Sequence, residues 1–211
     1  MSILRQKNKS ASFLSLGSQA DFAKKERVLT HQLTAPENHA REVILLELGW
    51  LYDQRALISP PWRKKTYQKK ARYYFNRAMR NGAKRWIVYN GLGTVSLHEG
   101  KYKEALWYYK KMHAIHNSSI SHNAMGNAYR QLKKFAVAKK RYETSVILSK
   151  NVEEKSAAIY NLIQLSRDRK EGGRQIVSNR YYKMMKKFST QSLLARVLFN
   201  RIKKASAHGT A

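Results

Sequence analysis

A pattern of small and large residues recurs along this chain, and it constrains the fold more than any other feature of the sequence. The segment YNGLGTVSLHEGKYKEALWYYKKM (residues 89–112) is matched 33 residues later by HNAMGNAYRQLKKFAVAKKRYETS (residues 122–145). Small residues at fixed positions let two antiparallel helices approach closely, and large residues fill the gaps beside them. One such hairpin cannot bury its apolar face alone, so the repeat predicts stacked helical hairpins.

The pattern resembles the tetratricopeptide repeat (TPR), whose period is 34 residues. The matching positions are Leu92, Gly93, Gly100, Tyr102, Ala105 and Tyr109 in one copy, and Met125, Gly126, Tyr129, Phe135, Ala138 and Tyr142 in the next. The resemblance implies an all-α, right-handed α-solenoid of about four hairpins. It also implies that the first helix of each hairpin lines a concave groove and that the second helices form the back.

An earlier hairpin is predicted upstream, because three residues match the second helix of the pattern: Ala71, Phe75 and Ala78. Its first helix is expected between Pro36 and about Gln54. This hairpin holds about ten more residues than the next one, and we expect them in its turn around Pro60 and Trp62.

A degenerate fourth hairpin is predicted downstream, beginning with a helix over Ala157–Ser166. Ser189 or Thr190 is predicted to be the N-cap of a last helix, because both belong to the residue types that cap helix N-termini. The apolar residues that follow predict a last helix that closes the array: Leu193, Leu194, Val197, Leu198 and Ile202. The expected parts are therefore a basic, Ser-rich and partly disordered arm (1–33, with a short helix at 21–33), a solenoid (34–188, with hairpins at about 36–82, 86–117, 119–150 and 155–188), a capping helix (189–204) and a flexible tail (205–211).

The charge is the second strong feature. Lysine and arginine outnumber aspartate and glutamate by 42 to 13, a formal net charge of +29. No acidic residue occurs in residues 54–98 or in residues 172–211. Charges of one sign at this density repel one another in the folded state, so they predict an anionic partner.

Several of these cations fall on stripes of the predicted second helices, and they are the candidate polyanion-binding residues: Arg63, Lys64, Lys65, Lys69, Arg72, Arg80, Lys139, Lys140, Arg180, Lys183 and Lys187. The phosphates of RNA fit such a surface. Four aromatic residues lie among the cations and are able to stack on unpaired bases: Trp62, Tyr67, Tyr73 and Trp86. Most aromatic residues in such repeats serve packing, and only Trp62 is expected to be exposed. A membrane surface would also attract this charge, but the last helix does not favour that role.

The predicted groove is lined by amides and is only mildly basic. Its candidate residues are Asn90, Thr94, Asn123, Asn127, Arg130, Tyr160, Gln164 and Arg167. Asparagine donates and accepts hydrogen bonds, so it can pair with an extended peptide backbone. TPR proteins that clamp acidic C-terminal peptides use two asparagines with lysine and arginine. Asn127 and Asn161 stand at the two asparagine positions, but Asn123 replaces the first lysine.

Nothing in the sequence suggests catalysis. The chain has no cysteine, and its one histidine cluster, at residues 113, 116 and 122, has no acidic neighbour in sequence, so neither a metal nor a cofactor is expected. Gly91 and Gly93 lie inside a predicted helix and are explained by close packing rather than by a phosphate loop.

Two compartments fit the sequence. The absence of cysteine fits a reducing one, and we expect a cytoplasmic protein. The alternative is a mitochondrial one, because residues 1–20 hold five serines, three basic residues and no acidic residue, as transit peptides do. No run of eighteen apolar residues occurs.

The leading hypothesis is a non-catalytic scaffold or adaptor. Its groove takes a protein segment or helix, and its basic surface docks on an anionic partner such as RNA or a ribonucleoprotein. The alternative is an adaptor or co-chaperone-like module that captures acidic peptides in the groove and has no nucleic-acid role.

Overall fold

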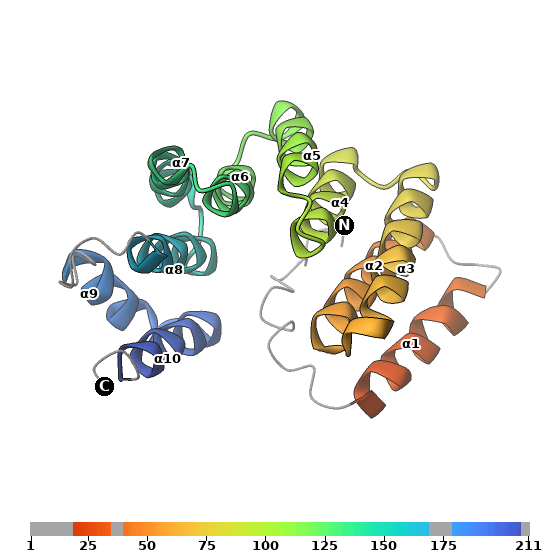
Figure 1. The fold of residues 1–211 in the computed structure, drawn as a ribbon. Coiled ribbons are helices and arrows are strands. Elements are labelled where there is room, and N and C mark those ends of the chain that lie inside the picture. The colour runs from red at the N-terminus through yellow and green to blue at the C-terminus, as the bar shows by residue number, and fades with distance from the viewer. Residues whose placement is uncertain (1–18, 35–39, 169–178, 208–211) are drawn as a thin grey trace, which may run out of the picture. The chain divides into compact units, whose positions relative to one another are not determined.

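The structure is a computed structural model that describes residues 19–34, 40–168 and 179–207. These residues form α-helices joined by turns, with no strand among them (Figure 1), and the prediction of an all-α chain is confirmed. In chain order the helices are α1 (Gln19–Thr34), α2 (Arg41–Ile58), α3 (Pro61–Arg80), α4 (Arg85–His98), α5 (Tyr102–Ile115), α6 (Ser119–Gln131), α7 (Phe135–Leu148), α8 (Val152–Asp168), α9 (Asn179–Phe188) and α10 (Leu193–Ala207). Residues 1–18 of the predicted arm and residues 208–211 of the predicted tail lie outside the described part.

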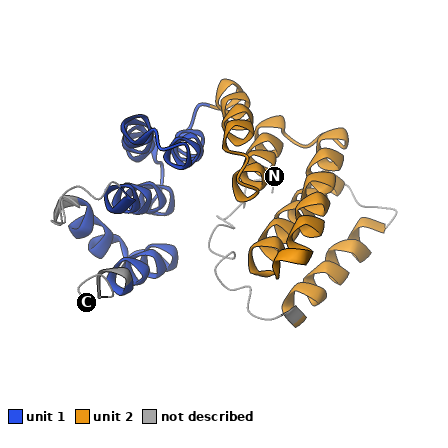
Figure 2. Ribbon diagram, in the orientation of Figure 1, with its two compact units in different colours: residues 1–14, 117–211 blue, residues 15–116 orange. Residues whose placement is uncertain are grey.

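The chain divides into two compact units (Figure 2). Unit 2 spans residues 15–116 and holds α1 to α5. Unit 1 holds α6 to α10, from residue 117 onward. Within the units, consecutive helices pack as pairs: α2 with α3, α4 with α5, α6 with α7, and α8 with α9. These pairs are consistent with a helical repeat.

The glycine and the tyrosine of the repeat pattern are packing partners within one hairpin. A Cβ atom added to Gly93 would lie 2.5 Å from Cε1 of Tyr109, and one added to Gly126 would lie 2.5 Å from Cε1 of Tyr142. Both tyrosine rings are buried. The first helix must therefore carry a glycine where the ring of the second helix lies against it.

Phe75 of α3 takes the place of this tyrosine and contacts two glycines. A Cβ on Gly49 of α2 would lie 2.7 Å from Cε1 of Phe75, and a Cβ on Gly91 of α4 would lie 2.5 Å from the same atom. Gly91 thus serves the ring of the preceding hairpin, and Gly93 serves the ring of its own hairpin. The expectation that Gly91 and Gly93 are explained by close packing is confirmed.

The Gly126→Ala change is expected to lower the free energy of unfolding of unit 1 by about 1–3 kcal/mol, because the new methyl group overlaps the Tyr142 ring. Alanine is otherwise the better helix residue, by about 0.5–1 kcal/mol, so only the overlap makes the change unfavourable. Urea unfolding followed by circular dichroism measures the destabilisation. In a Tyr142→Ala background the same change should be neutral or stabilising, and an equal destabilisation in both backgrounds would contradict the packing of the two residues.

The extra residues of the first hairpin lengthen its helices, so the prediction that they form a long turn was wrong. Helices α2 and α3 have 18 and 20 residues, whereas α4 and α5 have 14 each. Only Ser59 and Pro60 separate α2 from α3, and Pro61 is the first residue of α3. Proline is well suited to that position because its fixed φ is helical and its missing N–H would have no partner there.

The predicted short helix at residues 21–33 forms α1 and closes the core of unit 2. Its apolar residues Phe22, Leu29 and Leu33 are buried in one cluster with residues of α2, α3 and α4. The carboxylate of Glu26 accepts a hydrogen bond from the Tyr52 hydroxyl and pairs with Arg55 at 3.2 Å. Burial, followed by the bond to Glu26, raises the pKa of Tyr52.

Helix α10 packs on α8 and α9 as the predicted closing helix. Leu194, Leu198 and Ile202 are buried in a cluster with residues of α8 and α9, whereas Leu193 is exposed. The predicted N-cap was wrong. The hydroxyls of Ser189 and Thr190 donate to carbonyl groups in the last turn of α9, and the residue that accepts from a backbone N–H of α10 is Ser192.

Candidate polyanion-binding surface

An exposed stripe of cations and aromatic residues runs along α3. One side of the helix is buried against the core of unit 2 through Ala71, Phe75 and Ala78. The other side carries exposed residues at spacings of three, four, four and seven, which place them on one helical face: Trp62, Lys65, Lys69, Tyr73 and Arg80. No acidic residue occurs in α3.

Helix α5 presents a second stripe of the same kind. Lys103, Trp107 and Lys110 are exposed on one face of α5, and the first two lie 34 residues after Lys69 and Tyr73. The guanidinium of Arg72 on α3 bonds Glu104 on α5, so the two helices are joined directly. We call the five residues of the α3 stripe and these three residues of α5 the α3–α5 surface.

Trp107 and the aromatic pairs of this surface were not predicted from the sequence. Tyr73 meets Tyr74 edge to face at 5.2 Å between ring centroids, and Trp107 meets Tyr108 in the same way at 4.9 Å. The inner rings, Tyr74 and Tyr108, pack against the core of unit 2, and each outer side chain stays 52% exposed. The signal was present in the sequence, because the aromatic pair at residues 73–74 recurs at residues 107–108.

The four aromatic residues singled out by sequence divide into two kinds. Tyr67 stacks on Tyr52 at 6.2 Å, and Trp86 stacks on His116 at 4.5 Å, so both serve packing. Trp62 is exposed as predicted, at 71%, but it lies in the first turn of α3 instead of a loop. The Arg63 guanidinium lies 4.3 Å from the centre of its ring. Tyr73 is exposed as well, against the expectation.

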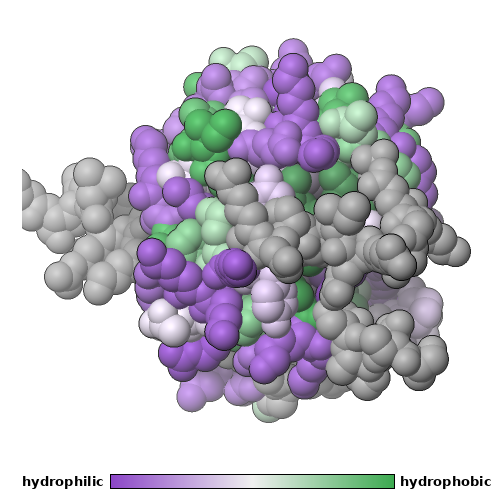
Figure 3. Space-filling view, turned by 90° about the vertical axis from the view of Figure 1, so that its left-hand side faces the viewer, coloured by the Kyte–Doolittle hydropathy of each residue, from purple (hydrophilic) through white to green (hydrophobic). Residues whose placement is uncertain are grey.

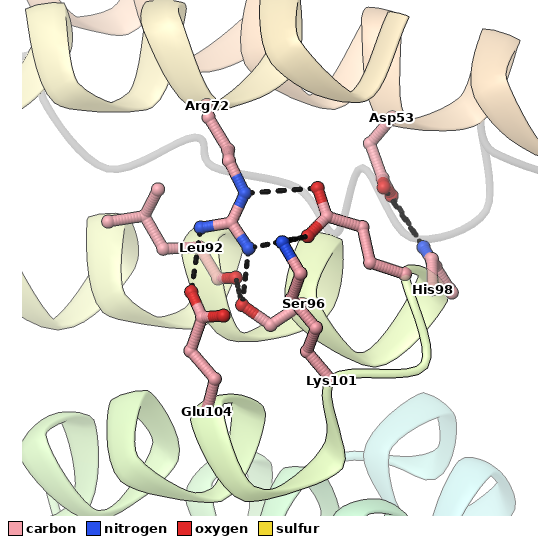
Figure 4. A network of polar contacts seen from close by, with 8 residues as sticks. Asp53, Arg72, Leu92, Ser96, His98, Lys101 and Glu104 are labelled. Atoms are coloured by element: carbon pink, nitrogen blue, oxygen red, sulfur yellow. Dashed lines mark hydrogen bonds and ion pairs between the residues drawn. The ribbon is translucent and has the colours of Figure 1, made fainter. Parts of the chain in front are cut away.

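Arg72, one of the predicted polyanion-binding residues, lies outside the exposed stripe and is bonded within unit 2. Its side chain is half-buried, and its guanidinium donates to both carboxylate oxygens of Glu99, at 3.0 and 2.8 Å, and to Glu104 at 2.9 Å (Figure 4). A further N–H donates to the Ser96 hydroxyl at 3.0 Å. The bond to Glu99 raises the pKa of Arg72 despite burial. Arg72 therefore joins the first hairpin to the second.

The carboxylates near Arg72 are occupied. Burial by itself would raise the pKa of Glu99, but its bonds from Arg72 and Lys101 outweigh burial and lower that pKa. The buried carboxylate of Asp53 bonds Nδ1 of His98 at 2.9 Å (Figure 4). By contrast, the cations of the α3–α5 surface form no ion pair with any described residue: Lys65, Lys69, Arg80, Lys103 and Lys110. Arg63 is exposed beside them, and Lys64 is half-buried.

The remaining predicted cations lie in unit 1. Lys139 and Lys140 are exposed on α7, where Lys139 lies 4.0 Å from Glu143. Lys183 and Lys187 are exposed on α9. The side chain of Arg180 falls outside the described residues.

In Figure 3 hydrophilic residues cover most of the described surface on the face shown, and hydrophobic residues form small separate groups.

Two predicted groove residues lie in unit 2. The Thr94 hydroxyl donates to the backbone carbonyl of Asn90 at 2.9 Å and lies 3.3 Å from the hydroxyl of Tyr109. Asn127 of unit 1 occupies the equivalent position of its own repeat and accepts a hydrogen bond from Tyr142 at 2.8 Å. This position of the repeat therefore bonds the tyrosine that packs on the preceding glycine.

The other predicted groove residues of unit 1 bond one another or neighbouring helices. Asn161 of α8 donates to Asn123 of α6 at 2.9 Å. Arg130 pairs with Asp168 at 2.5 Å, and Arg167 donates to the backbone carbonyl of Ile202 at 3.1 Å. Burial lowers the pKa of Arg130, but the bond to Asp168 outweighs it. Tyr160 and Gln164 are half-buried on α8.

Metal sites and membrane spans are absent from the described residues. Among them, no group of three or more His, Cys, Asp or Glu side chains is placed to hold a metal ion. None of the described helices has the length and apolar character needed to cross a membrane.

No protein-family model matches the chain, and no curated protein matches it significantly.

Proposed function

We propose that this chain is a non-catalytic scaffold of the tetratricopeptide type, a right-handed solenoid whose α3–α5 surface docks on RNA or a ribonucleoprotein. In a helical repeat, exposed residues at equivalent positions recur at regular intervals along the array. A polyanion carries its charges at regular intervals as well, so it suits such a surface.

One observation carries the proposal. Five cations are exposed on two neighbouring second helices without an ion-pair partner in the described chain, while Arg72 beside them is neutralised by two glutamates. The carboxylates of Glu99 and Glu104 are already bonded to Arg72, and Glu99 also to Lys101. The field of these five cations is therefore directed to solvent, where it attracts an anion.

The predicted groove gives weaker support for a protein ligand than the α3–α5 surface gives for an anionic one. Asn123, Asn127, Arg130 and Arg167 already make hydrogen bonds inside unit 1. A peptide would have to compete with those bonds or use the remaining donors and acceptors. Binding of acidic peptides in the groove is therefore the alternative that the following experiment distinguishes from RNA binding.

The test is fluorescence anisotropy with the full chain, a labelled mixed-sequence RNA of about 20 nucleotides and an acidic peptide of equal charge. Binding to RNA should fall steeply as salt rises from about 50 to 200 mM, with a log–log slope of about −3 or steeper, because each neutralised phosphate releases counterions. Asn123→Ala combined with Asn127→Ala should leave RNA binding unchanged. Peptide binding that needs these two asparagines, together with RNA binding that is weak and indifferent to salt, would reject the proposal.

A further inference from the structure

We infer that the α3–α5 surface selects unpaired RNA, with bases stacked on Tyr73 and Trp107 and phosphates held by the lysines beside them. This inference rests on the proposed function and names the form of RNA that the surface takes. A surface that needed only positive charge would not require exposed aromatic rings.

The two rings are presented in the same way one repeat apart. Each outer ring meets an inner ring edge to face, at 76° for Tyr73 on Tyr74 and at 79° for Trp107 on Tyr108. The inner rings are fixed against the core of unit 2. The outer rings are therefore held in place before any ligand arrives, which reduces the entropic cost of binding.

A lysine accompanies each ring at the same distance along the helix. Lys69 precedes Tyr73 by four residues, and Lys103 precedes Trp107 by four residues, so each cation lies one turn away on the same face. Lys110 follows Trp107 by three residues on that face, and Lys111 lies 5.5 Å from the centre of the Trp107 ring. The motif is a base-stacking platform flanked by phosphate-binding cations, and it occurs twice.

The combination of exposed rings and neighbouring lysines distinguishes unpaired RNA from paired RNA. In an RNA duplex the base faces are stacked on one another and only their edges are exposed in the grooves, so the rings would gain little there. An unpaired strand can turn its bases onto the rings while its phosphates reach the lysines. An acidic peptide would use the lysines alone.

The experiment compares three probes of similar charge with the full chain: an oligouridylate of about 20 nucleotides, an RNA duplex and inorganic polyphosphate. The unpaired strand should bind tightest. Replacing both rings, Tyr73→Leu with Trp107→Leu, should weaken oligouridylate binding by about 30-fold or more, since each stacked base contributes at least about 5-fold. Binding of the duplex and of polyphosphate should stay within about 2-fold, and the salt slope should not change, because no cation is removed.

Two further variants separate stacking from damage to the fold. Tyr73→Phe with Trp107→Tyr retains the rings and should keep most of the affinity. Ile147→Ala removes an apolar side chain that is 80% exposed on α7 of unit 1, outside the α3–α5 surface, and should have no effect. Equal weakening for all three probes, or no weakening for oligouridylate, would overturn the inference and leave the proposed function standing. Failure to bind either RNA probe would reject both.

Discussion

Reversing the charge at Lys65, Lys69, Lys103 and Lys110 is expected to weaken RNA binding by at least about 100-fold near physiological salt. These lysines are exposed on α3 and α5 and pair with no described carboxylate. Each change to glutamate removes a cation that neutralises a phosphate and adds a repulsion. The salt slope should therefore also fall by about one for each phosphate that is no longer neutralised. Anisotropy titrations at several salt concentrations measure both effects.

The control variant carries the same change of net charge elsewhere. Four exposed lysines outside the α3–α5 surface serve this purpose: Lys24, Lys134, Lys150 and Lys204. Changing them to glutamate should weaken binding far less. An equal effect of the two quadruple variants would mean that binding follows the total charge and that no particular surface is used. Arg72 is left out because Arg72→Glu would add a carboxylate beside Glu99 and Glu104 and would disturb the fold itself.

The Phe75→Ala change is expected to lower the free energy of unfolding of unit 2 by about 3–5 kcal/mol. The ring is fully buried, meets Trp50 edge to face at 5.0 Å, and lies against glycines of two different helices. The backbone at Gly49 and Gly91 offers no side chain to fill the cavity. Urea unfolding followed by tryptophan fluorescence is a selective readout, because all four tryptophans of the chain lie in residues 15–116.

Tyr73→Ala is the matched control for Phe75→Ala, two residues away on the same helix. Its ring is 52% exposed, so its removal should cost only about 1 kcal/mol. If the two variants unfold at the same urea concentration, the Phe75 ring does not hold the hairpins together as described.

The hairpins were predictable because the repeat pattern records the packing of residues within a hairpin. Gly93 faces Tyr109 and Gly126 faces Tyr142, so the spacing of small and large residues encodes the packing directly. The turn of the first hairpin was not predictable in this way. Two consecutive prolines indicate a turn, but whether the second of them starts a helix depends on how the longer α2 and α3 pack along each other.

The role of Arg72 shows where charge counting along the chain fails. Residues 54–98 contain no acidic residue, and the partner of Arg72, Glu99, is the first residue after that stretch. Glu104 lies 32 residues from Arg72 in sequence. Ion pairs between successive hairpins join residues about one repeat apart, so only a comparison of equivalent positions in neighbouring repeats would have found them. The same comparison would have revealed Trp107.

The unpaired cations of the α3–α5 surface make the stability of unit 2 depend on its surroundings. Lysines that repel one another raise the free energy of the folded state, and a polyanion that binds only the folded state lowers it in proportion to the logarithm of its concentration. Folding and ligand binding are thereby linked equilibria. With the proposed anionic partner, the amount of folded protein in a cell would follow the supply of that partner, and a chain without it would be degraded sooner.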